Sequence, residues 1–387
     1  MKTLGKWKKR VVVLAASLLY TLTVSTPVFA APTIKAFSLP AGSNPFGITL
    51  GQDGNLWFCE RGTNKIGKMS TSGVLLAQYT VPTSSADPFE ITNGPDGNLW
   101  FTESSGNKIG KITTSGTITE YSTGLSASAQ PTGITSGHDG NLWFTEGNPL
   151  APKIGKITTS GTITEYSLGG GYNLSSGITA GPNGDVWFSD GGIGEITPSG
   201  TITEYSTGSI DPTIVVAGTD GNLWFNYWNG SSISKMTPSG TITTYPTPTN
   251  SAYYGMTVAP NGDIWYSGAD SGSKIGFMTT SGTATEYTPP SSSTGPAGIT
   301  TTPNGNVWFA DQGASEIDEV VLSADSSGSS GSTTNSAKVS SDPSSPNTGY
   351  GRPTNSSLIV EALAVGSVIT IAAGLLIARR SNQNPNP

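Results

Sequence analysis

Hydrophobic and polar residues alternate in short runs along most of this chain, and one such run occurs seven times. It is a glycine-containing turn followed by an aliphatic residue, a tryptophan and a second aromatic residue, as in DGNLWF at residues 96–101. The tryptophans of the copies are Trp57, Trp100, Trp143, Trp187, Trp224, Trp265 and Trp308. By subtraction they stand 37 to 44 residues apart. A repeat of roughly 40 residues built from short strands predicts the blades of a β-propeller.

One complete unit, residues 88–121, shows what each blade contains. Its runs of β-branched and aromatic residues predict four antiparallel strands, at residues 88–92, 99–103, 108–112 and 117–121. Gly97 occupies the turn position that needs a positive φ. Four antiparallel strands make one blade, so the fold class is an all-β, seven-bladed β-propeller.

The two ends of the repeat array complement each other. The hairpin leading into the fourth strand occurs only six times, and the seventh unit ends at residues 316–320 without it. Residues 33–37 (TIKAF) align with the fourth strand at residues 117–121. We therefore predict that the N-terminal strand completes the last blade, which closes the ring and removes exposed sheet edges.

The segments outside the array predict a secreted, membrane-tethered protein. Residues 1–30 have the positive start, apolar core and small residues of a signal peptide, which leaves residues 31–322 as the propeller. Residues 323–357 are rich in Ser, Thr, Gly and Pro and predict a disordered linker. Residues 358–380 predict a transmembrane anchor helix, followed by a short cytoplasmic tail at residues 381–387.

A wall-sorting signal is a second way in which the chain could be held at the cell surface. Residues 345–349 (SPNTG) resemble the Leu-Pro-any-Thr-Gly signal that sortases cleave, except that Ser345 replaces the leucine. A sortase-type enzyme is therefore a candidate partner, and we expect the propeller outside the cell in either case.

Composition narrows the function classes. Charged residues make up only 12% of the chain and the formal net charge is −7, so we expect no nucleic-acid partner. We expect the negative charge to serve solubility, and we expect a monomer. The single cysteine, Cys59, excludes an intramolecular disulfide. We expect it to be a buried, inert thiol, because a catalytic thiol needs a nearby histidine and the chain has one, His138.

Strand order predicts a binding face. The start of strand one and the end of strand two meet at the edge opposite the Asp-Gly turns, where binding loops usually lie. Candidate ligand-binding residues at this edge are Phe46, Phe89, Tyr254, Glu60, Glu103, Glu146, Asp190, Tyr227 and Asp311. The carboxylates predict an acidic mouth for a cation or polar ligand. Alternatively, each carboxylate caps a turn or meets a lysine such as Lys65, Lys108 or Lys153.

Blades five and six depart from the repeat. Tyr227 and Trp228 replace the acid in blade five, and Tyr254 stands in strand one of blade six. Exposed aromatic rings suit stacking on a sugar ring or a macrocycle. The same residues could instead be packing substitutions, and both interpretations stay open here.

The combined motifs resemble a known family. PTGIT at 131–135, DGNLWFTE at 139–146, NKIGKI at 107–112 and SGTITEY at 115–121 are similar to those of the streptogramin B lyase (virginiamycin B lyase) family, and the similarity covers about residues 33–321. The resemblance implies a seven-bladed propeller and a Mg²⁺-dependent elimination that opens a cyclic depsipeptide antibiotic. It also implies catalytic histidines before the glycine of the last blades' Pro-x-Gly-Ile motifs.

The chain departs from the family at those histidines. The corresponding positions hold Tyr254 and Ala297, and His138 lies in a turn of blade three on the opposite face. An elimination needs a general base near neutral pH, for which histidine is suited. No catalytic residue is therefore assigned.

Three functions remain. The first is a surface-tethered module that binds an extracellular glycan, peptide or small molecule at its loop face. The second is a lyase or hydrolase that uses carboxylates and Mg²⁺, since carboxylate oxygens suit this ion. The third is a spacer or adhesion module without a small-molecule site.

Overall fold

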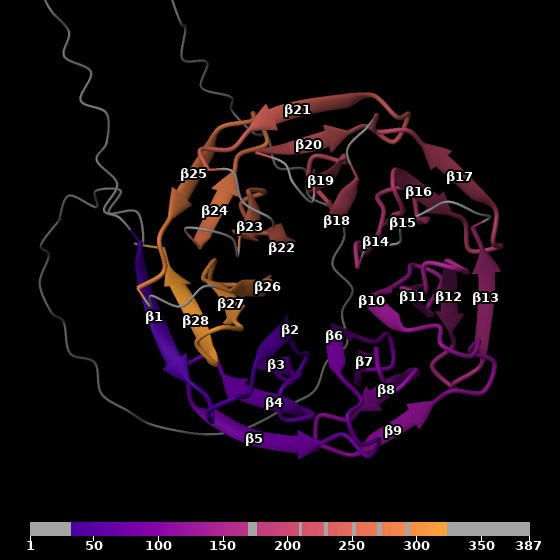
Figure 1. Cartoon of the computed structure of the whole chain (residues 1–387). Coiled ribbons are helices and arrows are strands. Elements are labelled where there is room, and N and C mark those ends of the chain that lie inside the picture. Colours follow the sequence, from indigo (N-terminus) through magenta and orange to yellow (C-terminus); the bar gives the residue numbers. More distant parts are fainter. Residues whose placement is uncertain are drawn as a thin grey trace, which may run out of the picture. The chain divides into compact units, whose positions relative to one another are not determined.

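The computed structural model describes residues 32–168, 176–208, 211–227, 231–249, 253–268, 273–290 and 295–322. These residues form one compact unit of seven four-stranded antiparallel sheets. The sheets are arranged as blades around a central channel, as Figure 1 shows. The predicted seven-bladed propeller is confirmed.

Each blade begins at the channel and continues outward in chain order, except that β1 forms the outer strand of blade seven. The first strands are β2 (Pro45–Leu50), β6 (Pro88–Asn93), β10 (Pro131–Ser136), β14 (Ile178–Ala180), β18 (Pro212–Ala217), β22 (Tyr253–Val258) and β26 (Pro296–Thr301). The second strands are β3 (Asn55–Glu60), β7 (Leu99–Glu103), β11 (Leu142–Glu146), β15 (Val186–Ser189), β19 (Leu223–Tyr227), β23 (Ile264–Gly268) and β27 (Val307–Asp311). The third strands are β4 (Lys65–Ser70), β8 (Lys108–Ile112), β12 (Lys153–Ile157), β16 (Ile193–Ile196), β20 (Ser232–Met236), β24 (Lys274–Met278) and β28 (Glu316–Val321). The fourth strands are β5 (Leu75–Thr80), β9 (Ile118–Tyr121), β13 (Ile163–Ser167), β17 (Ile202–Tyr205), β21 (Ile242–Pro246), β25 (Ala284–Tyr287) and β1 (Thr33–Ser38).

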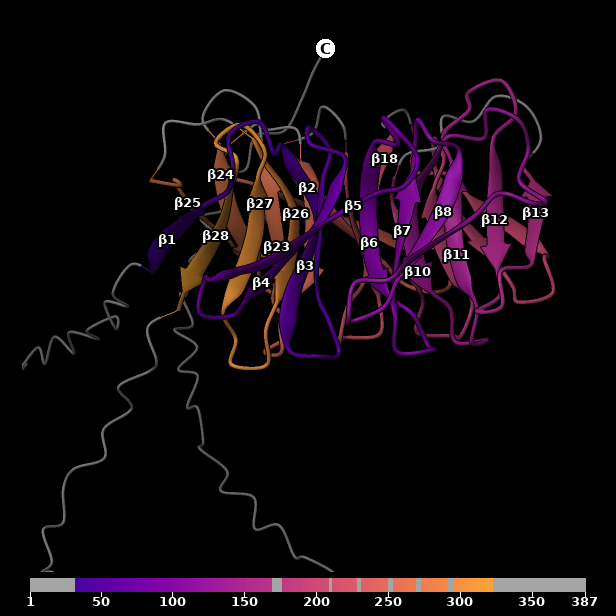
Figure 2. The ribbon, with the colours of Figure 1, turned by 90° about the horizontal axis from the view of Figure 1, so that it is seen from below.

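The turn between the first two strands follows the sequence prediction. Gly97 has a φ of 78°, a left-handed conformation that glycine adopts without steric strain. Seen from the side in Figure 2, inner strands such as β2 and β6 stand nearly upright, while the outer strand β5 leans across them. This inclination is the usual twist of a β-sheet.

The hydrophobic core lies between the blades. Trp57 of blade one packs with Leu99, Phe101 and Ile112 of blade two, and the contact recurs around the ring until Trp308 of blade seven packs against blade one. All seven repeat tryptophans are buried. Because each interface between blades is a small core of its own, a chain of this length can fold without one large hydrophobic core.

In blades one to five a polar clasp satisfies the buried indole N–H, whereas that of Trp265 in blade six has no hydrogen-bond partner among the described residues. The Nε1 of Trp100 donates a hydrogen bond of 3.0 Å to Oδ1 of Asp96 in the preceding turn. Lys111 lies 5.1 Å from the centre of the same indole ring. Burial raises the pKa of Asp96, but hydrogen bonds from Trp100 and Asn98 and the charge of Lys111 outweigh it, so the pKa lies below its usual value. The turn residue of the repeat therefore holds the core tryptophan.

The N-terminal strand closes the ring as predicted. β1 pairs with β28 over six residues, from Thr33 opposite Val321 to Ser38 opposite Glu316. Phe37 stacks on Trp308 with ring centroids 5.4 Å apart, the position that a tyrosine of strand four holds in other blades, such as Tyr79 on Trp57. The first strand therefore completes blade seven with the same packing as in the other blades.

The predicted signal peptide, linker, anchor and tail lie outside the described residues, and they stay predictions. Within the ranges that the structure describes, no helix is long and apolar enough to cross a membrane.

The clasp can be tested with a substitution that the repeat itself offers. Asp96→Ala should destabilise the propeller by about 1–3 kcal/mol, because it leaves the buried Trp100 N–H without an acceptor. Asp96→Asn should have a much smaller effect, since Asn183 accepts from Trp187 at 3.1 Å in blade four. Thermal unfolding of the two variants measures the difference, and equal losses would contradict the clasp.

Deleting residues 31–40 tests the closure. The melting temperature should fall sharply, by roughly 10 °C or more, because blade seven loses its outer strand and the Phe37 stack. Lys35→Ala is the control, since it removes only a half-exposed ion pair of 3.1 Å with Glu319 and should change stability by less than about 1 kcal/mol. An unchanged melting temperature after the deletion would count against the closure.

Candidate functional site

The start of strand one and the end of strand two share one edge of each blade, as the sequence predicted. Pro45 pairs with Glu60 and Pro88 with Glu103, and the same register recurs in other blades. In six blades the pairing shifts just after the first residue, which marks a β-bulge. Because a bulge re-aims the following side chains, residues two and three of these strands turn toward the channel and its rim.

The prediction of an acidic mouth is wrong. The five carboxylates are at most 1% exposed, so they do not line an open face. They are Glu60, Glu103, Glu146, Asp190 and Asp311. The period-two pattern places them at the correct edge, but their side chains lie inside the blades.

In blade one, a glycine in strand three makes room for the Phe58 ring and for the carboxylate of Glu60. A Cβ on Gly67 would lie 2.7 Å from Oε1 of Glu60, so the carboxylate lies directly over the glycine. Gln78 of strand four donates to both oxygens of Glu60, at 2.8 and 2.7 Å, and Thr63 donates at 3.0 Å. Glu60 is therefore a satisfied structural group, which matches the turn-capping alternative.

In blades two and three the partner in strand four is a second carboxylate. Glu103 meets Glu120, and Lys108 binds Glu120 at 2.7 Å. Burial, and then the charge of Glu120, raise the pKa of Glu103 to about 8. Glu146 has the same environment beside Glu165, and its pKa is also raised to about 8. The buried member of each pair is therefore protonated at neutral pH.

Blades four and seven also hold carboxyl pairs with a buried member, Asp190 in blade four and Asp318 in blade seven. Burial and the neighbouring Asp190 raise the pKa of Glu204 to about 8. In blade seven, burial and then Asp311 and Glu316 raise the pKa of Asp318 to about 8. Glu204 is exposed on the outer strand, whereas Asp190, Asp311 and Asp318 lie inside their blades.

The described residues do not fit a Mg²⁺ site. Nowhere in the part of the chain that the structure describes do three His, Cys, Asp or Glu side chains converge in a way that could hold a metal. With pKa values raised to about 8, Glu103 and Glu146 also keep protons that a Mg²⁺ ligand would have to lose. No metal-dependent step is assigned to them.

Two predicted aromatic residues do meet at the rim. The rings of Phe46 and Phe89 lie 4.3 Å apart, and the guanidinium of Arg61 lies 5.2 and 4.7 Å from their centres. Asp87 binds Arg61 through two contacts of 2.7 and 2.9 Å. This stack, which we call the rim clamp, joins blades one and two.

The other predicted aromatic residues have separate positions. Tyr227 is buried, packs edge-on against Phe225 and shares a hydrogen bond with Ser234, so it is a packing substitution. Trp228 lies outside the described residues. Tyr254 lines the central channel, where it faces a cavity. The predicted set therefore divides into the rim clamp, the channel and the buried blades.

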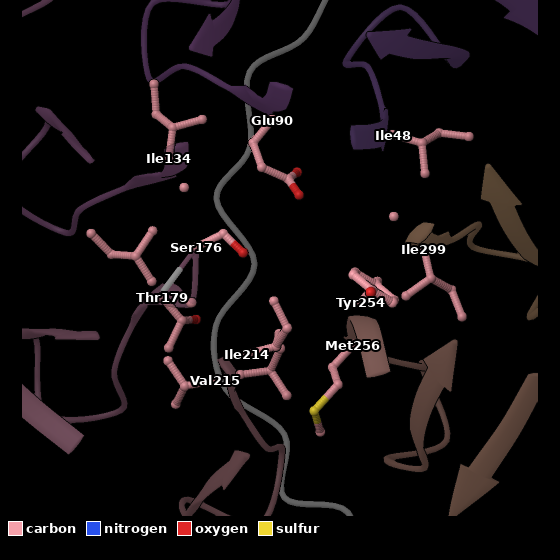
Figure 3. A pocket seen from close by; sticks show the side chains of 16 residues that line it. Ile48, Glu90, Ile134, Ser176, Thr179, Ile214, Val215, Tyr254, Met256 and Ile299 are labelled. Atoms are coloured by element: carbon pink, nitrogen blue, oxygen red, sulfur yellow. The ribbon is translucent and has the colours of Figure 1, made fainter. Parts of the chain in front are cut away.

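The central channel contains a cavity of about 130 Å³. Its wall comes mainly from the first strands and mixes polar groups, including glycine backbone, with aliphatic side chains such as Ile178, Ile214 and Val216. Figure 3 shows the side-chain oxygens of Glu90 and Ser176 directed toward the open centre, with Tyr254 across from them. Glu90 is the only charged residue among those that line the cavity within the described chain.

Glu90 is the functional candidate that the sequence prediction missed. Its side chain is partly exposed to the narrow channel but is otherwise surrounded by protein. This burial raises its pKa to about 8, although a hydrogen bond from the Ile91 backbone and the charge of Arg61 act in the opposite direction. Five of the other six units have glycine at its position, namely Gly47, Gly133, Gly177, Gly255 and Gly298. The exception was therefore visible in the repeat.

The remaining candidates for chemistry lie apart from this cavity or are not suited to it. His138 is an exposed turn residue at the other end of blade three. Cys59 is fully buried, and burial, followed by the charge of Glu90, raises the pKa of its thiol well above the usual value, as expected for an inert thiol. Ala297 is also buried.

The comparisons agree with this architecture. The model of the virginiamycin B lyase family matches residues 28–209 and 172–339. The chain belongs to this family. Among curated proteins, none matches the chain significantly.

Solved structures of family members superpose on nearly their whole length. A streptogramin B lyase structure is 36% identical with a TM-score of 0.69, covering 75% of this chain and 98% of that one. Virginiamycin B lyase from Staphylococcus aureus is 34% identical with a TM-score of 0.70, covering 75% and 99%. A catalytically inactive histidine-to-alanine variant of that enzyme with quinupristin is 34% identical with a TM-score of 0.69, over the same shares.

The buried carboxyl pairs predict a pH dependence of stability. The folded protein keeps a proton on Glu103 up to about pH 8, whereas an unfolded chain releases it near the ordinary value of 4.5. Stability should therefore fall as the pH rises between these values. Thermal unfolding of Glu103→Gln from pH 5 to pH 8.5 should show a shallower fall than the parent chain, because the amide can donate to Glu120 without titrating.

Asp211→Asn is the control for this experiment. Asp211 is exposed, so its amide variant should keep the parent slope. A Glu103→Gln variant whose slope equals that of the parent would show that the blade-two pair does not hold the proton.

Proposed function

We propose that this chain is a cell-surface binding module of the streptogramin lyase type that does not catalyse the family's elimination. The module binds a small molecule, or an apolar group of an extracellular peptide or glycan conjugate, at the loop-face mouth of its channel. The observation that carries the proposal is the channel cavity, which places a single carboxyl group among aliphatic side chains and backbone polar groups. Ligand sites are typically concave and mostly apolar with few, well-placed polar groups.

The positions of the family's histidines support the non-catalytic half of the proposal. The resemblance assigns them to Tyr254 and Ala297, and neither residue accepts a proton near neutral pH as histidine does. Glu90 is the one carboxyl group in the cavity, but it has no neighbouring His, Lys or Asp in the described wall to act as a catalytic partner. A binding site is therefore better supported than a lyase centre.

The rim clamp supports binding at the mouth. Phe89 is partly exposed and is packed against Phe46 and Arg61, and aromatic surface that is already ordered loses little entropy when a ligand covers it. The predicted signal peptide and anchor place this mouth outside the cell, where such ligands occur. A Mg²⁺-dependent lyase remains the second candidate, because the chain is 36% identical to a streptogramin B lyase.

Incubation with a streptogramin B separates the two candidates. The full chain, with and without Mg²⁺, should leave the ring closed when the mixture is followed by chromatography and mass spectrometry. A known family lyase under the same conditions is the positive control. Ring opening by this chain at a rate near that of the control would overturn the non-catalytic proposal.

Binding itself is tested at the rim. A streptogramin B and soluble peptidoglycan fragments should be titrated against the full chain by calorimetry, and Phe89→Ala should weaken any observed binding about tenfold or more. Leu76→Ala on the exposed face of blade one is the control and should have no effect. Binding that is insensitive to Phe89→Ala would place the ligand away from the mouth.

A further inference from the structure

We propose that the channel cavity is a site for a small organic amine, in which the carboxylate of Glu90 pairs with the ammonium group and the organic body lies along the mixed wall of the channel. This inference rests on the proposed function, because it names the class of ligand group that enters the channel. It concerns one residue, Glu90, that the fold does not require.

The charge of the cavity favours a cation. Glu90 is the only ionisable carboxyl group among the described lining residues, and no lysine, arginine or histidine lines the cavity with it. An anionic ligand would meet this carboxyl group with no cation to compensate. An ammonium group would gain a partner in a setting of low dielectric, where a charge pair is stronger than in water.

The nearest positive charge is already engaged. Arg61 lowers the pKa of Glu90 by its charge, but its guanidinium is bound in two contacts by Asp87 and stacked on two phenylalanines. Gly47 of β2 lies against Glu90, and the Cys59 thiol of β3 is near enough to interact with its charge. Gly133 and Tyr254 line the same cavity. The carboxyl group therefore has no direct cationic partner among these neighbours.

The second polar group suits an ammonium ion. The hydroxyl oxygen of Ser176 is directed toward the same open centre as the carboxyl group (Figure 3). An ammonium group has three N–H donors and no acceptor, so it can donate to Glu90 and to Ser176 together. A neutral alcohol of the same shape could use these partners only as a single donor.

The size of the cavity limits the ligand group. A volume of about 130 Å³ is well below the ~300 Å³ or more of a drug-sized pocket. It is close to that of apolar protein cavities of ~150 Å³ that bind benzene. The site therefore takes one ring or a short chain bearing an amine, either as a free amine or as the end of a larger ligand at the mouth.

The repeat shows that Glu90 is not needed for the blade. Five other blades have glycine at this position. Glu90 lies against the backbone of Gly47, and a Cβ built on Gly47 would be 2.7 Å from the Cα and Oε2 atoms of Glu90. Burying a carboxyl group without a cationic partner is unfavourable, so its presence in the channel needs a compensating role. A ligand cation supplies it.

Amine binding should be coupled to proton release. With a pKa of about 8, Glu90 is mostly protonated at pH 7, and it must lose this proton to solvent before it pairs with an ammonium ion. The apparent affinity is reduced by the fraction that is not ionised, so it should rise about tenfold per pH unit from pH 6 to pH 7 and level off above pH 8.

Calorimetric titration of the full chain with benzylamine tests the inference. Binding should tighten with pH as described and should release up to one proton per amine, counted by repeating the titration in buffers of different ionisation enthalpy. Benzyl alcohol, the neutral analogue, should bind more weakly at pH 8 and without pH dependence. Glu90→Gln should weaken benzylamine binding at pH 8 at least tenfold and abolish its pH dependence.

Glu90→Gly is the matched variant, since it restores the residue of the other blades. It should keep the melting temperature and lose amine binding as Glu90→Gln does. The inference is overturned if benzylamine does not bind, if benzyl alcohol binds as tightly at pH 8, or if Glu90→Gln leaves the pH dependence unchanged.

These failures are distinguishable from failure of the proposed function. If the larger ligands still bind in a manner that depends on Phe89 while benzylamine does not bind, only the amine assignment is wrong. If neither the larger ligands nor benzylamine bind, both proposals fail.

Discussion

The whole ring depends on burying one tryptophan between each blade and the next, and in blades one to five the preceding turn pairs with the indole N–H. Burial of the indole supplies the large apolar contact, and the turn residue four positions earlier accepts the hydrogen bond, as Asp96 does for Trp100 at 3.0 Å. The same turn starts strand two, so the residue that satisfies the core also sets the position of the next strand. Each repeat thereby joins a local turn to a contact between blades, and seven such contacts form a closed circle.

This arrangement leaves only certain positions free to vary for function. Residues on strands two and three face neighbouring blades, and even their carboxylates are drawn inside, where Glu60 lies over Gly67. The first strands are different, because a bulge turns their early residues toward the channel and rim. Phe46, Phe89, Glu90 and Tyr254 all come from these strands. The variation that matters for binding is therefore concentrated on the innermost strand of each blade.

The sequence predicted the fold well, because tryptophan spacing and the missing seventh hairpin are local patterns. Even the joining of Thr33–Ser38 to the last blade followed from counting hairpins. The site was predicted less well. Periodicity places Glu60 at the correct edge but does not show that Gly67 in strand three leaves room for its carboxylate to lie inside the blade. The rim clamp depends on Arg61 reaching the next blade, which no local pattern reveals. Glu90 could have been found, since it interrupts a column of glycines.

The pairing of β1 with β28 makes completion of the ring an end-to-end event. Lys35 and Glu319 meet although 284 positions separate them. Closing a chain segment of this length has an entropic cost of about 5 kcal/mol, beyond that of ordering each blade. The strand that is synthesised first can find its partner only after the last blade has been made, so six blades can form before the circle does. The first strand of the propeller is therefore the last to be paired, and the sheet of blade seven is complete only when the whole propeller has been made.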